Sequence, residues 1–240
     1  MRILIVNDDG MQAAQLPNLI RWARTIGDVT VFVPKFEQSG KSHSFIMNRD
    51  IEVKQEKIAE DITVWSVDAT PADCVRFAVL AKHMEFDLCI SGVNRGFNMG
   101  SDIMYSGTVA AAYEAVNLGI PAVALSTSFE NYPQATQELD TVFRFFRDHR
   151  LMDVNNIYNV NIPANPRGVR ITRQGGPSYS DDFPSVGENL YRPTGKPVWE
   201  DNGDDTLDTD ATKHGYITIT PLQLDRTNRA VFEKLQLLEV

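Results

Sequence analysis

Two adjacent carboxylates, Asp8 and Asp9, follow a short apolar run near the start of the chain. Residues 2–10 read RILIVNDDG, so the run Ile3–Val6 gives way at once to polar residues and a glycine. Like charges side by side repel, and they lose hydration where a strand enters a core. Hard divalent cations prefer oxygen ligands, which carboxylates at a strand end supply. The pair predicts a site for Mg²⁺ or Mn²⁺; the alternative is an Asx turn that caps the next helix.

Two other classes of phosphate-handling domain also place acidic residues after a first strand, and the spacing excludes both. A receiver domain needs a phosphoacceptor aspartate at the end of a later strand, whereas Asp50 and Asp61 each precede a predicted strand. A phosphatase of the haloacid-dehalogenase type needs two aspartates separated by one residue, whereas Asp8 and Asp9 are adjacent.

The segment SGKS, residues 39–42, ends like a phosphate-binding P-loop. A P-loop also needs a glycine five positions before Gly40, and that position is Lys35, so an ATPase loop is excluded. The Ser39 hydroxyl could instead complete a metal shell, with Gly40 letting the backbone come close. The alternative is a solvated loop.

The glycine-rich stretch SGVNRGFNMGSDIMYSGTVAAAYEA, residues 91–115, combines exposed backbone with polar side chains. Its spacing does not fit a dinucleotide fingerprint, but glycines suit tight turns that expose N–H groups. Asn94 could offer a neutral oxygen to a metal. Ser106, Gly107 and Thr108 stand where a helix is predicted to begin, and free N–H groups with the helix dipole favour a phosphate there. The alternative for Ser106 is a simple N-cap.

The elements that must position these residues alternate between strand and helix. The predicted strands are 3–6, 29–33, 51–54, 62–67, 87–91, 121–126, 157–162 and 216–220; the predicted helices are 16–26, one starting at 70, 106–118, 136–149 and about 230–238. Continuous apolar strands alternating with helices predict an α/β fold, a Rossmann-like three-layer sandwich with a mainly parallel sheet. Chemistry in such folds lies at the carboxyl ends of the strands, where the three polar segments should meet.

The character of the sequence changes after Pro163. Residues 175–214 are rich in Gly, Pro, Asp and Ser and show little periodicity, which is unusual inside a compact domain. We therefore predict a catalytic core over 1–174 and, over 175–240, an extended arm or hairpin for oligomerisation with a strand and a C-terminal helix.

The acidic composition disfavours long nucleic acids as partners and leaves a small phosphorylated molecule possible. The chain has 240 residues, 42% of them hydrophobic, and a formal net charge of −9. An acidic protein repels long nucleic acids, but a bound metal can still attract one small phosphorylated molecule. The two cysteines, Cys74 and Cys89, predict buried thiols in a reducing compartment. Neither a signal peptide nor an apolar run long enough to span a membrane is present, so we expect a cytoplasmic location without membrane partners.

These motifs together resemble the SurE family of stationary-phase survival proteins and 5′-nucleotidases. The resemblance rests on NDDG (7–10), SGKSHS (39–44), TPADCV (70–75), residues 87–115 and GYITITPL (215–222). It implies a phosphomonoesterase that hydrolyses nucleoside 5′-monophosphates with one divalent metal ion and assembles as a homodimer or homotetramer through the C-terminal arm. The implied metal ligands are Asp8, Asp9, Ser39 and Asn94. The implied phosphate-binding residues are Gly40, Asn98, Ser106, Gly107 and Thr108, and the implied catalytic residues are Asp8, Asp9 and Ser106.

The chain departs from the family pattern at a few positions. Ala13, Ala14 and Gln15 replace a usual Ala-Pro-Gly turn, Ala69 replaces a glycine, and Leu207-Asp208 replaces Thr-Asp. The altered turn leaves open a second function, a non-catalytic nucleotide or phosphate sensor that retains the metal site. For an enzyme, Asp8 or Asp9 could orient the attacking water, or one of them could form an aspartyl-phosphate.

Overall fold

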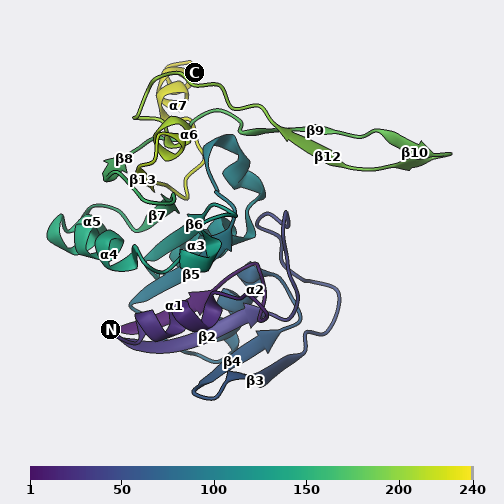
Figure 1. Ribbon diagram of the computed structural model, residues 1–240, viewed down its shortest axis with the longest axis vertical. Coiled ribbons are helices and arrows are strands. Elements are labelled where there is room, and N and C mark those ends of the chain that lie inside the picture. The colour runs from purple at the N-terminus through teal and green to yellow at the C-terminus, as the bar shows by residue number, and fades with distance from the viewer. Residues whose placement is uncertain (239–240) are drawn as a thin grey trace.

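A nine-stranded β-sheet forms the centre of the computed structural model, which describes residues 1–238 (Figure 1). The strand order is β3-β4-β2-β1-β5-β6-β7-β13-β8. The bounds are β1 Arg2–Val6, β2 Asp28–Pro34, β3 Val53–Ala59, β4 Ile62–Val67, β5 Leu88–Arg95, β6 Ala122–Thr127, β7 Ile157–Ile162, β8 Val169–Ile171 and β13 Ile217–Pro221. Neighbouring strands from β4 to β7 are parallel, whereas β3 pairs antiparallel with β4 and β13 with β7.

Helices cover both faces of this sheet. Their bounds are α1 Leu16–Ala23, α2 Pro71–Arg76, α3 Gly107–Asn117, α4 Leu139–Asp148, α5 Leu151–Val154, α6 Asp208–Lys213 and α7 Arg229–Gln236. Shorter helical segments are a π-helix over Phe77–Ala81 and 3₁₀ turns over Gly100–Tyr105 and Tyr132–Gln134. Thr70 caps α2 through a reciprocal pair of hydrogen bonds with Asp73, which confirms the predicted helix start.

The alternation of side chains along β1 explains the three layers. Ile3 and Ile5 belong to the apolar cluster that includes residues of α1 and α4, whereas Leu4 and Val6 belong to the cluster that includes residues of α2 and α3. All four side chains are fully buried, so the strand contacts a helix layer on each side. The predicted three-layer α/β fold is confirmed.

Strand β5 runs further than the sequence predicted. The glycine after Ser91 suggested an end, but the pairing with β6 resumes after a bulge, with Asn94 opposite Ser126 and Arg95 opposite Thr127. Asn94 therefore stands at the end of a central strand rather than in a free loop. The other differences lie at element ends: the strand predicted at 51–54 spans 53–59, and the helix predicted from 136 begins at 139.

The region predicted as an arm with a strand and a C-terminal helix, 175–240, contains strand β13 and helix α7 beside a projecting segment. Strand β13 lies inside the main sheet between β7 and β8, so part of the region completes the core. The segment that projects from the body comprises two antiparallel pairs, β9 (Tyr179–Asp182) with β12 (Thr194–Pro197) and β10 (Ser185–Gly187) with β11 (Leu190–Tyr191), as Figure 1 shows. Residues 239–240 of the predicted arm lie outside the described residues.

Both cysteines are buried and unbonded, as predicted. Burial raises the pKa of the Cys89 thiol to about 12, so it stays protonated. Across residues 1–238, every helix is too short or too polar to cross a membrane.

Candidate metal and phosphate site

Asp8 and Asp9 lie at the carboxyl end of β1, on the turn that leaves the sheet. The turn is shaped by Asn7, whose side chain accepts the Gly10 N–H at 3.1 Å and donates to the Gly10 carbonyl at 3.0 Å. Gly10 has φ +82°, a conformation that favours glycine, and a Cβ there would meet the backbone of Phe36 at 3.0 Å. This turn is made by Asn7 and does not use the aspartate side chains, and helix α1 has no side-chain cap, so the predicted alternative, an Asx turn of the aspartates that caps the next helix, is not what forms.

Asp8 is buried against the first turn of helix α3. Its carboxylate accepts the backbone N–H of Thr108 at 3.1 Å and also the Thr108 hydroxyl. Gly107 permits this approach, because a Cβ there would lie 2.9 Å from the Asp8 Cβ. Burial raises the pKa of Asp8, and the Thr108 hydrogen bonds offset part of the rise.

Asp9 is half-buried beside Asp8 and accepts the backbone N–H of Arg95 at 3.3 Å. Burial, followed by the negative charge of Asp8, raises the pKa of Asp9 to about 7. Neither aspartate has a salt bridge to any described residue. The charge of Arg95 offsets only part of the rise in the pKa of Asp9. A buried and a half-buried carboxylate side by side without a salt bridge fit a divalent cation, which would supply further positive charge.

The loop after β2 approaches the aspartates through its backbone. The Gln38 N–H donates to the Asp8 carbonyl at 2.8 Å, which places Ser39 one residue away from this contact. The Ser39 hydroxyl donates to Glu37 at 2.6 Å, and Ser39 and Gly40 are exposed. Glu37, which the sequence analysis did not single out, adds to the raised pKa of both aspartates through its charge.

Asn94 stands near the end of β5, the strand that pairs with β1. Its side-chain N–H₂ donates to the Gly96 carbonyl at 2.8 Å, and its oxygen accepts no hydrogen bond from a described residue. Since Arg95 also contacts Asp9, the ends of β1 and β5 are joined directly. Within residues 1–238, no group of three His, Cys, Asp or Glu side chains lies close enough to hold a metal. A cation here would take two carboxylates, the neutral oxygens of Ser39 and Asn94, and water, a set that suits Mg²⁺.

Two of the N–H groups at the N-terminus of α3, which the sequence predicts to be free for a phosphate, donate to protein side chains instead. Ser106 is the N-cap of this helix and accepts the Val109 N–H at 3.1 Å, and Thr108 donates to Asp8. Gly107 is the first-turn residue whose N–H has no hydrogen bond to a described residue. Thr108 is therefore seen to hold Asp8, while phosphate binding by Ser106, Gly107 and Thr108 stays a prediction.

Asn98 is fixed by the ends of β6 and β7. Its backbone carbonyl accepts N–H groups from Asn159 at 2.7 Å and Asn161 at 2.8 Å, and its own N–H donates to Asn161 at 2.9 Å. Its side chain donates to the Ser126 hydroxyl at 2.8 Å. The side-chain oxygen of Asn159 is buried without a hydrogen-bond partner. The two strand asparagines hold the glycine-rich loop over the sheet edge, a role that the sequence analysis did not recognise.

A second unforeseen group links the Ser39 loop to α3. Glu114, buried on α3, lies 2.7 Å from His43 and 3.2 Å from Arg76 of α2. Burial alone would raise the pKa of Glu114, but the hydrogen bonds and charges of His43 and Arg76 outweigh it and hold this pKa below its usual 4.5. Three elements around the site are thus tied at one carboxylate. In the sequence, the one indication of this contact was an acidic residue within a helix of small residues that is predicted to pack on the sheet.

The chain is similar to known proteins along nearly its whole length. A family described as Survival protein SurE matches residues 3–181. The protein named 5′-nucleotidase SurE of Gemmatimonas aurantiaca is 40% identical over 96% of this chain and 96% of its own length; its namesake in Pelotomaculum thermopropionicum is 37% identical over 98% and 94%. The crystal structure of the SurE protein from Aquifex aeolicus covers both chains fully with a TM-score of 0.79 at 32% identity.

Proposed function

The chain belongs to the SurE family, and from that premise we propose that it hydrolyses nucleoside 5′-monophosphates to nucleoside and phosphate with one Mg²⁺ or Mn²⁺ ion. The relatives' shared name, 5′-nucleotidase SurE, supports the reaction class. The observation that supports the metal dependence is the pair Asp8 and Asp9, neighbouring carboxylates at a sheet edge that form no salt bridge with any of residues 1–238.

In the proposed site each residue has a defined task. Asp8 and Asp9, with the neutral oxygens of Ser39 and Asn94, would hold the cation. When bound, the cation supplies charge neutralisation at the phosphate and lowers the pKa of a water. The free N–H of Gly107 and the positive end of the α3 dipole favour the phosphate oxygens, and positioning of this kind is the main contribution to phosphoryl transfer.

The proposed reaction is direct hydrolysis. The oxygen of a water bonds to phosphorus while the bond from phosphorus to the 5′ oxygen of the nucleoside breaks. Asp8 or Asp9 orients this water or accepts its proton, and the nucleoside oxygen gains a proton. With a substrate whose phosphate is made chiral by oxygen and sulfur labels, a single displacement by water should invert the configuration at phosphorus. Retention would indicate two displacements and replace this scheme with an aspartyl-phosphate.

The variant Asp9→Asn tests the proposal because it removes one charge and preserves the side-chain shape. Loss of a residue that only supports a metal ligand typically lowers activity by about 10–100-fold. Since Asp9 is proposed as a ligand itself, we expect phosphate release from AMP with Mn²⁺ to fall by more than this. Mn²⁺ binding measured by calorimetry should weaken in parallel, with an unchanged circular dichroism spectrum. The exposed Asp28→Asn, at the opposite end of the neighbouring strand, is the matched control and should retain full activity. Only a modest loss in Asp9→Asn would contradict the ligand assignment.

We also propose that the protein assembles as a homodimer or homotetramer through the arm. Apolar side chains are exposed on the arm, and further ones on α7: Tyr179, Phe183, Val186, Leu190, Tyr191, Val231, Phe232 and Leu235. An isolated two-stranded hairpin is marginally stable in water, so burial against a second copy would account for its extension from the body.

A further inference from the structure

A cavity of about 740 Å³ opens at the edge of the sheet opposite the candidate metal site. It is lined by the start of β5 at Leu88, by Pro121 just before β6, and by residues of α1, α4 and α5. Asp8 and Asn94 stand at the other ends of β1 and β5, so the cavity is separated from them by the length of a strand. Its size lies within the range of pockets that bind small molecules.

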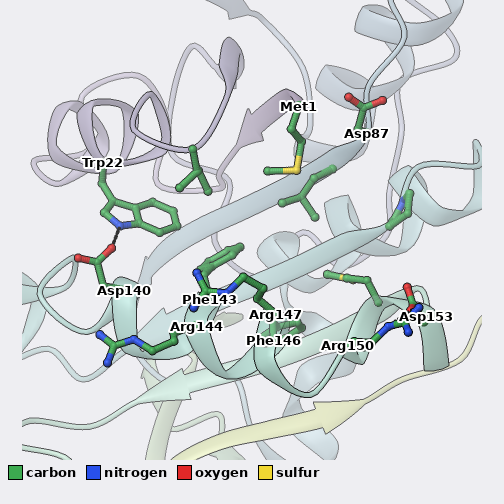
Figure 2. A pocket seen from close by; sticks show the side chains of 14 residues that line it. Met1, Trp22, Asp87, Asp140, Phe143, Arg144, Phe146, Arg147, Arg150 and Asp153 are labelled. Atoms are coloured by element: carbon green, nitrogen blue, oxygen red, sulfur yellow. Dashed lines mark hydrogen bonds and ion pairs between the residues drawn. The ribbon is translucent and has the colours of Figure 1, made fainter.

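The walls of the cavity are mainly aromatic and aliphatic. Trp22 of α1 and Phe143 of α4 lie with ring centroids 4.7 Å apart and planes tilted by 52°, and Phe146 follows one turn along α4. Met152 of α5 adds a thioether. Figure 2 shows the Trp22 indole on one side and the rings of Phe143 and Phe146 below. Such walls suit the flat apolar body of an aromatic ligand.

The carboxylates around the cavity already have partners. Asp87 accepts from the backbone and the guanidinium of Arg2, which lowers the pKa of Asp87 to about 2. Asp140 accepts the Trp22 indole N–H at 2.8 Å, the dashed line in Figure 2, and Asp153 accepts from Arg150 at 2.6 Å.

Two cations of the lining remain without a carboxylate inside the cavity. Arg144 has no hydrogen bond or salt bridge to any residue in the described part of the chain. Arg147 pairs only with its neighbour Asp148, an exposed pair that contributes little and could release the guanidinium to a ligand. Both arginines lie one turn apart on α4, the helix that also carries Phe143 and Phe146.

We propose that this cavity binds an amphipathic organic anion. An aromatic body packs against the wall formed by Trp22, Phe143 and Phe146, and a carboxylate, sulfonate or phosphate head pairs with Arg144 and Arg147. A protein partner fits the cavity less well, because the lining includes the exposed carboxylates of Asp87, Asp140 and Asp153, and aspartate is depleted in stable interfaces. The inference is independent of the nucleotidase proposal.

The experiment compares two fluorescent probes on the full-length protein. Anilinonaphthalenesulfonate carries a sulfonate, and phenylnaphthylamine is its uncharged counterpart. We expect saturable binding of one sulfonate probe per chain. In the double variant Arg144→Gln, Arg147→Gln, the affinity for the sulfonate should fall by at least about tenfold, while the affinity for the neutral probe should change by less than about twofold.

The matched control is the double variant Arg21→Gln, Arg24→Gln. It removes the same charge from α1 and its C-cap, where both arginines pair with Asp61 outside the cavity. It should leave the affinities for both probes unchanged. An equal loss in both double variants would mean that net charge, rather than this site, attracts the sulfonate, and would overturn the proposal.

Energy transfer from tryptophan locates the bound probe. Trp22 lines the cavity, whereas Trp65 and Trp199 do not. A protein with Trp65→Phe and Trp199→Phe should retain transfer to the sulfonate, and Trp22→Phe alone should lose most of it. Transfer that persists without Trp22 would overturn the proposal. A second contrary result would be an Arg144→Gln, Arg147→Gln variant that binds both probes normally but differs from wild type in molar mass by light scattering. That result would identify the cavity as a protein interface.

Discussion

Thr108 has a neighbour that the sequence did not reveal. Its place at a helix start predicts a phosphate contact, and in the structure its N–H and hydroxyl both donate to Asp8. The approach depends on Gly107, which leaves room for the Asp8 side chain. Sequence spacing places Thr108 at a helix start but gives no distance across the 100 residues that separate it from Asp8.

Replacing Thr108 with valine keeps the side-chain shape and removes the hydroxyl donor to Asp8. We expect Mn²⁺ affinity, measured by calorimetry without nucleotide, to fall about 10–100-fold, as is typical when an outer-shell partner of a metal ligand is lost. Thr108→Ser, which keeps the hydroxyl, should bind Mn²⁺ like the wild type. If Thr108→Val binds Mn²⁺ normally and only raises the KM for AMP, Thr108 is a phosphate ligand instead.

At the scale of elements, the sequence predicted which strands end at the site but not what holds their loops in place. The apolar strands 3–6 and 157–162 were found within one residue, because buried parallel strands read as continuous apolar runs. The end of β5 was missed, because its bulge lies at residues that usually interrupt a strand. The contact of Glu114 with His43 spans 71 residues, and no local pattern encodes such a pairing.

The Glu114 contacts predict a pH-dependent stability. The pKa of Glu114 is lower in the folded state than its usual 4.5, so its ionisation stabilises the fold above that pH and the stabilisation is lost as the pH falls through the folded-state value. We expect Glu114→Gln to lower the free energy of unfolding at pH 7 by about 1–3 kcal/mol, because a charged hydrogen-bond acceptor is lost. The difference from wild type, measured by urea unfolding, should shrink below pH 4.5.

The control for this experiment is Glu52→Gln, which removes an exposed carboxylate that also pairs with two cations, Lys35 and Lys54. Exposed pairs contribute little, so its unfolding free energy should stay within about 1 kcal/mol of wild type. Amide hydrogen exchange should also rise in residues 39–46 of Glu114→Gln. A Glu114→Gln protein as stable as wild type at pH 7 would show that the three elements are not tied by this carboxylate.

At the scale of the whole molecule, the base of the arm is bonded to the glycine-rich loop of the candidate site. Asp102 accepts N–H groups from Ser178 at 2.9 Å and Tyr179 at 3.1 Å, and Asp208 accepts those of Gly100 and Gly175. The low periodicity of 175–214 correctly indicated an element outside the sandwich. It could not reveal that β13 returns to the main sheet, since strand order depends on long-range pairing.

If the arm joins the copies, substitutions of its exposed apolar residues should separate the assembled protein into single chains. We expect light scattering to give a molar mass of two or four times 26.9 kDa, and the double variant Phe183→Asp, Leu190→Asp to shift it to the single-chain value, because charge would replace exposed apolar contacts. Val154→Asp, an equally exposed apolar position on α5, should leave the mass unchanged. A wild-type protein of 26.9 kDa at micromolar concentration would contradict the proposed assembly.

The most direct test of the proposed metal-dependent phosphatase is phosphate release from AMP by one protein sample in three states: as purified in Mn²⁺, after EDTA treatment and gel filtration, and after Mn²⁺ is restored. Because neither Asp8 nor Asp9 forms a salt bridge within the described chain, we predict that activity disappears with the metal and returns with it. Phosphate release that persists at the full rate in EDTA would contradict the account.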